Sequence, residues 1–139
     1  MRNSIFVLVA ALILSSSSAC KKTPSGDESS AEAVALKTLT VDEVATKLTQ
    51  PNTFVFDNNG VDRYKKGHVP GAKWIEPDMI TADALPKDKA ATLIFYCANE
   101  QCMACHSGAK AALALGYTNV YIMPAGIAGW EKSGKPLMV

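Results

Sequence analysis

The sequence has no excess of charge of either sign and no stripe of basic residues. Its 139 residues include 14 Lys and Arg against 13 Asp and Glu, which gives a formal net charge of +1. Proteins that bind nucleic acid present a basic patch or stripe to the phosphate backbone. We therefore expect no nucleic-acid partner for this chain.

A hydrophobic run long enough to cross a bilayer is also lacking. The apolar run Ile5–Leu14 is short, whereas a membrane-spanning helix needs about 20 residues. A basic start precedes this run, and the small residues Ser15–Ala19 follow it. Residues 1–19 thus have the three parts of a secretory signal peptide, and we predict an exported, periplasmic chain.

The predicted signal ends directly before Cys20, and in this it resembles a bacterial lipoprotein signal. That resemblance implies cleavage after Ala19 and a lipid on Cys20, which would anchor the mature chain to a bacterial membrane. Ser17 departs from the pattern, because such signals usually carry Leu at that position, and ordinary secretion is the alternative. Residues 20–35 contain no aromatic residue and are rich in Ser, Lys and Glu. This composition predicts a flexible tether, which leaves residues 36–139 as one small domain.

Strand patterns alternate with helix patterns along this domain. Thr40 and Glu43 form a capping box that predicts a helix start at Val41. The alternation predicts parallel pairing and a doubly wound α/β sheet flanked by helices. We expect helices over residues 41–49, 61–66 and 126–132 and one ending at residue 115, and strands over residues 53–56, 73–75, 93–96 and 120–122.

The stretch from Leu93 to Gly116 predicts a strand, a loop and a helix in succession. Leu93–Tyr96 is apolar with aromatic and β-branched residues, and an alanine-rich helix pattern then ends at Gly116. Cys97 therefore lies at the carboxyl end of a strand and before a helix, where α/β sheets bind ligands. Because backbone N–H groups and the helix dipole favour an anion there, we expect the pKa of Cys97 to be lowered.

Two further cysteines, Cys102 and Cys105, follow Cys97 closely in the same stretch. A structural disulfide framework joins distant parts of a fold, and three neighbouring cysteines do not have that pattern. The cluster therefore indicates sulfur chemistry at this loop.

The chain contains three segments in this order: Phe54-Val-Phe-Asp57 with Gly67-His-Val-Pro-Gly-Ala72, then Phe95-Tyr-Cys97, then Leu115-Gly-Tyr-Thr-Asn-Val120 with Gly126-Ile-Ala-Gly-Trp130. Together they resemble a rhodanese (sulfurtransferase) domain. The resemblance implies a single α/β domain in which the Cys97 thiolate takes sulfane sulfur and carries it as a persulfide. It also implies a small sulfur donor such as thiosulfate or a polysulfide and a thiol or cyanide acceptor, without a cofactor or a metal.

The loop after Cys97 is the substrate-binding element that this resemblance implies. Its backbone amides are expected to hold the terminal sulfur, and they belong to Ala98, Asn99, Glu100, Gln101, Cys102 and Met103. The family usually carries an arginine two residues after the aspartate of its first strand, whereas this chain has Asn59. Cys102 stands where the loop usually has a basic residue, and Glu100 adds a negative charge. An anionic donor would therefore meet less positive charge than is usual.

Several alternatives use the same residues. Cys102 can itself be the nucleophile, or it can form a disulfide with Cys97 in a thiol–disulfide redox protein. A domain without the arginine can also be a catalytically inactive binding module.

The sequence Cys102-Met-Ala-Cys105-His106 matches the attachment motif of c-type haem, which would give an electron-transfer lipoprotein. Cys97, Cys102, Cys105 and one histidine also have the right atoms for a zinc site. Against haem, the rest of the chain resembles a rhodanese, in which this helix packs against a sheet and leaves no room for a porphyrin. Against zinc, the adjacent residues Cys105 and His106 diverge on a helix. Helical spacing places Cys105 on the inward face of its helix, where a small buried cysteine is the ordinary interpretation.

Overall fold

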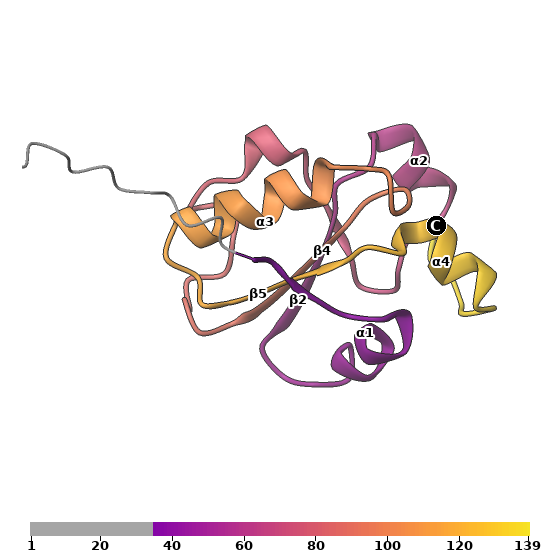
Figure 1. Cartoon of the computed structure of the whole chain (residues 1–139), viewed down its shortest axis with the longest axis horizontal. Helices are drawn as coiled ribbons and strands as arrows, with labels where there is room; N and C mark the ends of the chain where they lie inside the picture. The colour runs from indigo at the N-terminus through magenta and orange to yellow at the C-terminus, as the bar shows by residue number, and fades with distance from the viewer. Residues whose placement is uncertain (1–34) are drawn as a thin grey trace, which may run out of the picture. The chain divides into compact units, whose positions relative to one another are not determined.

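A computed structural model describes residues 35–139 of the chain (Figure 1). The predicted signal peptide, the predicted lipidation site Cys20 and all but the last residue of the predicted tether lie outside the described residues. Within residues 35–139, no helix has the length and apolar character needed to cross a bilayer.

The domain is built on five parallel strands in the order β1-β5-β4-β2-β3. The central strand, β4, pairs along its whole length with β2 on one side and β5 on the other. Because all strands run the same way, their carboxyl ends meet at one edge of the sheet. The strands are β1 (Lys37–Thr38), β2 (Thr53–Asp57), β3 (Lys73–Trp74), β4 (Thr92–Tyr96) and β5 (Asn119–Met123).

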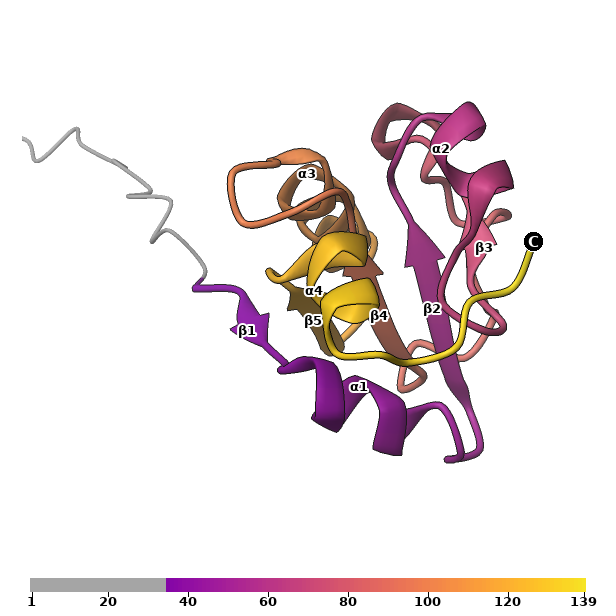
Figure 2. The same cartoon turned by 90° about the vertical axis from the view of Figure 1, so that its right-hand side faces the viewer.

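Helices cover both faces of this sheet, as Figures 1 and 2 show for α3 and α1. Side chains of β4 alternate between the two faces: Leu93 and Phe95 pack with α3, whereas Ile94 and Tyr96 pack with α1 and α4. This alternation explains why β4 is apolar throughout, as expected for a strand buried on both sides. The helices are α1 (Val41–Lys47), α2 (Val61–Lys66), α3 (Ala104–Ala114) and α4 (Gly126–Lys132), with the short 3-10 helix η1 (Pro77–Met79).

The predicted fold class is confirmed, and the local patterns explain most element boundaries. The capping box at the start of α1 is present, with the Glu43 amide donating to the Thr40 hydroxyl and the Glu43 carboxylate accepting from the Thr40 amide. Strand β1 was not predicted, because two residues carry no periodic pattern and it is specified by its pairing with β5. Helix α3 begins at Ala104, so residues 97–103 form the loop between β4 and α3.

Candidate active site

Cys97 lies at the carboxyl end of β4 and is completely buried, with 0% of its surface exposed. Two backbone contacts from α4 hold the chain at this point. The amide of Ile127 donates to the carbonyl of Cys97 at 2.9 Å, and the amide of Ala128 donates to the carbonyl of Ala98 at 3.0 Å. The position of the nucleophile predicted from the sequence is therefore fixed by the sheet on one side and by α4 on the other.

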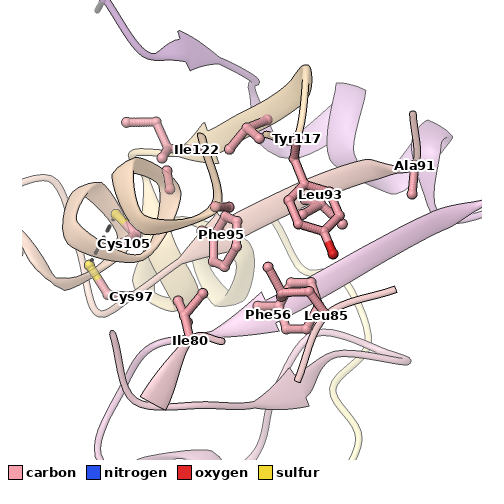
Figure 3. Packing of buried hydrophobic residues seen from close by; sticks show 13 residues of the cluster. Phe56, Ile80, Leu85, Ala91, Leu93, Phe95, Cys97, Cys105, Tyr117 and Ile122 are labelled. Atoms are coloured by element: carbon pink, nitrogen blue, oxygen red, sulfur yellow. Dashed lines mark hydrogen bonds between the residues drawn. The ribbon is translucent and has the colours of Figure 1, made fainter. Parts of the chain in front are cut away.

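The nearest reactive neighbour of Cys97 is Cys105, which lies in the first turn of α3 and is 1% exposed. The Cys97 thiol donates a hydrogen bond to the Cys105 sulfur, and the two Sγ atoms are 3.4 Å apart. Figure 3 shows the two sulfur atoms facing each other at one end of the apolar cluster that fills this side of the sheet. A third group, the carbonyl of Cys102, lies 3.2 Å from the Cys97 sulfur.

The pKa values of Cys97 and Cys105 are shifted in opposite directions. The hydrogen bond from Cys97 lowers the pKa of Cys105 below its ordinary value of 9.0. The same hydrogen bond raises the pKa of Cys97, and burial raises it further, while the thiol of Cys102 and the backbone N–H of Cys105 act in the opposite direction. The prediction that the helix lowers the pKa of Cys97 is therefore wrong. The helix N-terminus stabilises charge on Cys105, the cysteine that belongs to its first turn.

The loop of residues 98–103 forms its own hydrogen bonds. Asn99 accepts the amide of Gln101 on its side chain at 3.1 Å and the amide of Cys102 on its carbonyl at 3.1 Å. These two of the six predicted sulfur-binding amides are thus engaged within the loop. Binding of a terminal sulfur by the amides of Ala98, Asn99, Glu100, Gln101, Cys102 and Met103 stays a prediction. The side chains of Asn99, Glu100, Gln101 and Met103 are exposed, and that of Cys102 is partly exposed.

Gly126 allows α4 to approach the cysteine loop closely. Its φ angle is +61°, and a Cβ atom built there would lie 2.6 Å from the carbonyl oxygens of Cys97 and Ala98. Both the backbone conformation and the lack of space require glycine. This is the physical role of the glycine that begins the closing segment identified from the sequence.

Two surface pockets flank the loop. One of about 470 Å³ is lined by the start of α1 together with Glu100, Pro124 and Ala125. The other, of about 250 Å³, is lined by Asn99, Glu100, Gln101 and Lys132 among others. Cys97 lines neither pocket and is fully buried, so its sulfur is closed to a donor in this conformation.

A buried polar network occupies the end of β2, where the family usually has its arginine. Asn59 stands there, and both its amide and its side-chain NH₂ donate to one carboxylate oxygen of Asp57. The Tyr96 hydroxyl donates to the other carboxylate oxygen. Asp57 is 0% exposed, and these donors satisfy it without a cation. Nearby, the side-chain oxygen of Asn58 is buried without a hydrogen-bond partner.

The packing of α3 does not fit haem attachment through Cys102, Cys105 and His106. The sulfur of Cys105 contacts Cys97 inside the core, so a thioether bond to a porphyrin would require it to leave that core. The ring of His106 lies beside Cys105, with Nδ1 3.6 Å from its sulfur. In the part of the chain that the structure describes, no three His, Cys, Asp or Glu side chains are arranged to hold a metal ion.

Sequence reasoning missed two residues of this site. Cys105 was assigned to the core, although the inward face of α3 near its start is also the face that meets the end of β4. The helical spacing could therefore have indicated this contact, because a side chain on the inward face of the first turn of α3 also points toward Cys97. Lys132 lines a pocket beside the loop from α4, and no local pattern connects it with that loop.

Comparison with known proteins gives consistent matches. The family model described as "Rhodanese-like domain" matches residues 40–133. The Escherichia coli (strain K12) protein YibN is 27% identical over 106 residues, covering 74% of this chain and 73% of that protein. The BH2092 protein of Bacillus halodurans has a similar fold, with a TM-score of 0.68 and 22% identity over 73% of this chain and 76% of that chain. The Saccharomyces cerevisiae single-domain sulfurtransferase RDL2 matches with a TM-score of 0.60 and 22% identity, over 75% of this chain and 98% of that chain.

Proposed function

Because this chain belongs to the rhodanese-like domain family, we propose that it is a sulfurtransferase that carries sulfane sulfur as a persulfide on Cys97. Thiosulfate or a polysulfide is the proposed donor, and a thiol or cyanide is the proposed acceptor. A fold neighbour whose name describes it as a single-domain sulfurtransferase supports this choice of chemistry.

The 3.4 Å contact between the Cys97 and Cys105 sulfur atoms carries the proposal. A thiolate, not a thiol, is the attacking species, so Cys97 needs a group that takes its proton. Cys105 accepts the Cys97 S–H and is therefore the group positioned to take that proton, and its lowered pKa means that it gives up its own proton before Cys97 does. As Cys97 attacks the outer sulfur of thiosulfate, the S–S bond of the donor breaks, sulfite leaves with the bonding electrons, and the proton moves to Cys105.

The surroundings of the loop favour a donor with little need for positive charge. Lys132 is a cation beside the loop in the smaller pocket, and Glu100 lines the same pocket with the opposite sign. No arginine closes the end of β2, where Asn59 is bound to Asp57. We therefore propose that a polysulfide is a better donor than thiosulfate, because it lacks the sulfonate oxygens that charge-assisted hydrogen bonds would bind in thiosulfate.

The direct test is sulfur transfer from each donor to cyanide, measured as thiocyanate. We expect turnover with the wild-type protein and a fall to background in Cys97→Ser, whereas Cys102→Ser should still transfer sulfur. If Cys102→Ser is inactive and Cys97→Ser is active, Cys102 is the nucleophile. If the wild-type protein neither turns over nor gains a sulfur atom from any donor, the domain is an inactive binding module.

We further propose that the chain is exported and anchored by a lipid on Cys20. The arrangement of residues 1–20 supports this, with a basic start, a short apolar run and small residues before the cysteine. The intact mass of protein extracted from membranes tests it. A mature chain that begins at Cys20 with added acyl mass is expected, and a chain that retains residues 1–19 contradicts it.

A further inference from the structure

Cys97 and Cys105, two of the three cysteines in and beside the loop, form a pair of sulfur atoms in contact with each other. Cys97 and Cys105 are both buried, and their Sγ atoms are 3.4 Å apart. A disulfide has an S–S length of about 2.05 Å, so bond formation needs an approach of only about 1.4 Å. Both cysteines are free thiols in the structure. The pair is thus positioned for a reaction between its own sulfur atoms.

We propose that Cys105 is the resolving thiol of this site, which attacks the Cys97 persulfide, releases its outer sulfur as sulfide and leaves a Cys97–Cys105 disulfide. This inference rests on the proposed function, because it requires that a persulfide form on Cys97.

The step balances without any external oxidant. A bond forms between the Sγ atoms of Cys105 and Cys97, and the bond between Cys97 and the outer sulfur breaks. The outer sulfur takes the bonding electrons and is reduced to sulfide, while the two cysteines are oxidised to a disulfide. The proton of Cys105 and the persulfide proton leave together as hydrogen sulfide.

Geometry selects Cys105 over Cys102 for this role. Cys102 presents its backbone carbonyl to Cys97 at 3.2 Å, whereas Cys105 presents its sulfur. The first turn of α3 and the lowered pKa of Cys105 favour a thiolate at that position. Hydrosulfide is a weaker base than an alkyl thiolate, so it is the better leaving group in thiol–disulfide exchange. The sequence predicted a redox pair of Cys97 and Cys102. The pair proposed from the structure is Cys97 and Cys105.

Burial of the pair strengthens the argument. A persulfide on Cys97 would keep the Cys97 Sγ beside the Cys105 thiol, in a region where neither described pocket reaches. An external acceptor must open the loop to reach that sulfur, but Cys105 is already in contact. A cyanide or thiol acceptor that reaches the persulfide first takes its outer sulfur, as in the proposed function. Without such an acceptor the site forms the disulfide, which a dithiol reductant must then open.

Glu100 gives a convenient way to test this assignment by mass spectrometry. Cleavage after Glu100 separates Cys97 from the fragment that contains Cys102 and Cys105. We would treat the reduced protein with a polysulfide under anaerobic conditions, block free thiols, and measure both fragments and the released sulfide. The wild type is expected to release one sulfide per chain more than Cys105→Ala, because the shortened polysulfide leaves during loading in both proteins. It should also yield cross-linked fragments that are two hydrogens lighter than their sum.

Variants distinguish the two sulfur partners. Cys105→Ser and Cys105→Ala lack the neighbouring base and should load sulfur more slowly than the wild type, so both are treated for longer. Each should then keep one extra sulfur atom on the Cys97 fragment, with no cross-link and with about one sulfide per chain less than the wild type releases. Cys102→Ser is the matched control and should still form the cross-link. A stable persulfide on wild-type Cys97 without a cross-link overturns this inference and leaves the proposed function intact. An extra sulfur on the fragment with Cys105, or a cross-link lost only in Cys102→Ser, also overturns it. If no variant gains sulfur on Cys97, the proposed function itself fails.

Discussion

The hydroxyl of Tyr96 donates a 2.5 Å hydrogen bond to the buried carboxylate of Asp57. The same hydroxyl accepts the amide of Val69 at 3.1 Å, so one side chain joins β4, the end of β2 and the segment after α2. Burial first, and the charge of Asp57 second, raise the pKa of Tyr96, which keeps the phenol protonated and donating. Since Tyr96 directly precedes Cys97, this contact helps to fix the end of β4 at the candidate active site.

Tyr96→Phe should therefore destabilise the domain. It leaves one Asp57 oxygen and the Val69 amide without a partner, and an unsatisfied buried polar group costs about 1–3 kcal/mol. Urea unfolding of both proteins measures the difference. Tyr121→Phe is the control, because the Tyr121 ring contacts Lys37 and Lys47 through its face, which phenylalanine retains. Equal unfolding free energies for wild type and Tyr96→Phe would contradict the structural role of this hydroxyl.

Gly126→Ala should be far more damaging than the same change at Gly134. Both glycines have positive φ angles, +61° and +71°, and thus share the cost of a left-handed backbone, about 1–2 kcal/mol for alanine. Only at Gly126 would the added Cβ lie within 2.6 Å of the backbone of Cys97 and Ala98. We expect Gly134→Ala to lose about 1–2 kcal/mol and Gly126→Ala to exceed about 4 kcal/mol or to fail to fold.

Thermal unfolding of the two glycine variants in parallel measures this difference. The left-handed backbone is common to both, so any excess at Gly126 reports the close contact of α4 with the cysteine loop. Similar losses at the two positions would mean that α4 can move away from the loop at little cost.

The sequence predicted the fold well because the decisive patterns are local. The apolar strand Thr92–Tyr96 and the capping box at Thr40 each specify an element without reference to distant residues. The contact between Cys97 and Cys105 depends instead on how α3 lies against the sheet. That register follows from packing of the whole apolar cluster, and spacing alone did not give the resulting distance or the direction of the pKa shifts.

Native alkylation should label Cys102 before the other two cysteines of the domain. Cys102 is partly exposed, whereas Cys97 and Cys105 are 0% and 1% exposed. Reaction rates follow access as well as thiolate fraction, so the buried pair should react at least tenfold more slowly. Brief iodoacetamide treatment followed by cleavage after Glu100 and fragment sequencing gives the order. Denatured protein, in which all three should react alike, is the control, and faster native labelling of Cys97 would mean that the loop is open in solution.

The sulfur pair should also make stability depend on pH on both sides of 9.0, the ordinary pKa of a cysteine. Below 9.0, Cys105 has lost its proton in the folded protein at pH values where the unfolded chain still binds it, so stability rises with pH until 9.0 is reached. Above 9.0, the unfolded chain loses a proton that folded Cys97 retains, so stability falls as pH rises.

Urea unfolding of the fully reduced protein at intervals between about pH 6 and pH 10 tests this dependence against Cys105→Ala. The variant should lose the rise below 9.0, because it has no thiol in the first turn of α3. Its fall above 9.0 should be smaller, since the hydrogen bond that contributes most to the raised pKa of Cys97 is gone and only burial remains. The neighbouring titratable groups, Cys102 and His106, are present in both proteins and therefore largely cancel in the comparison. Parallel curves over the whole range would show that Cys97 and Cys105 do not share a proton in solution, and Cys105 would then lose its role as the base of the proposed reaction.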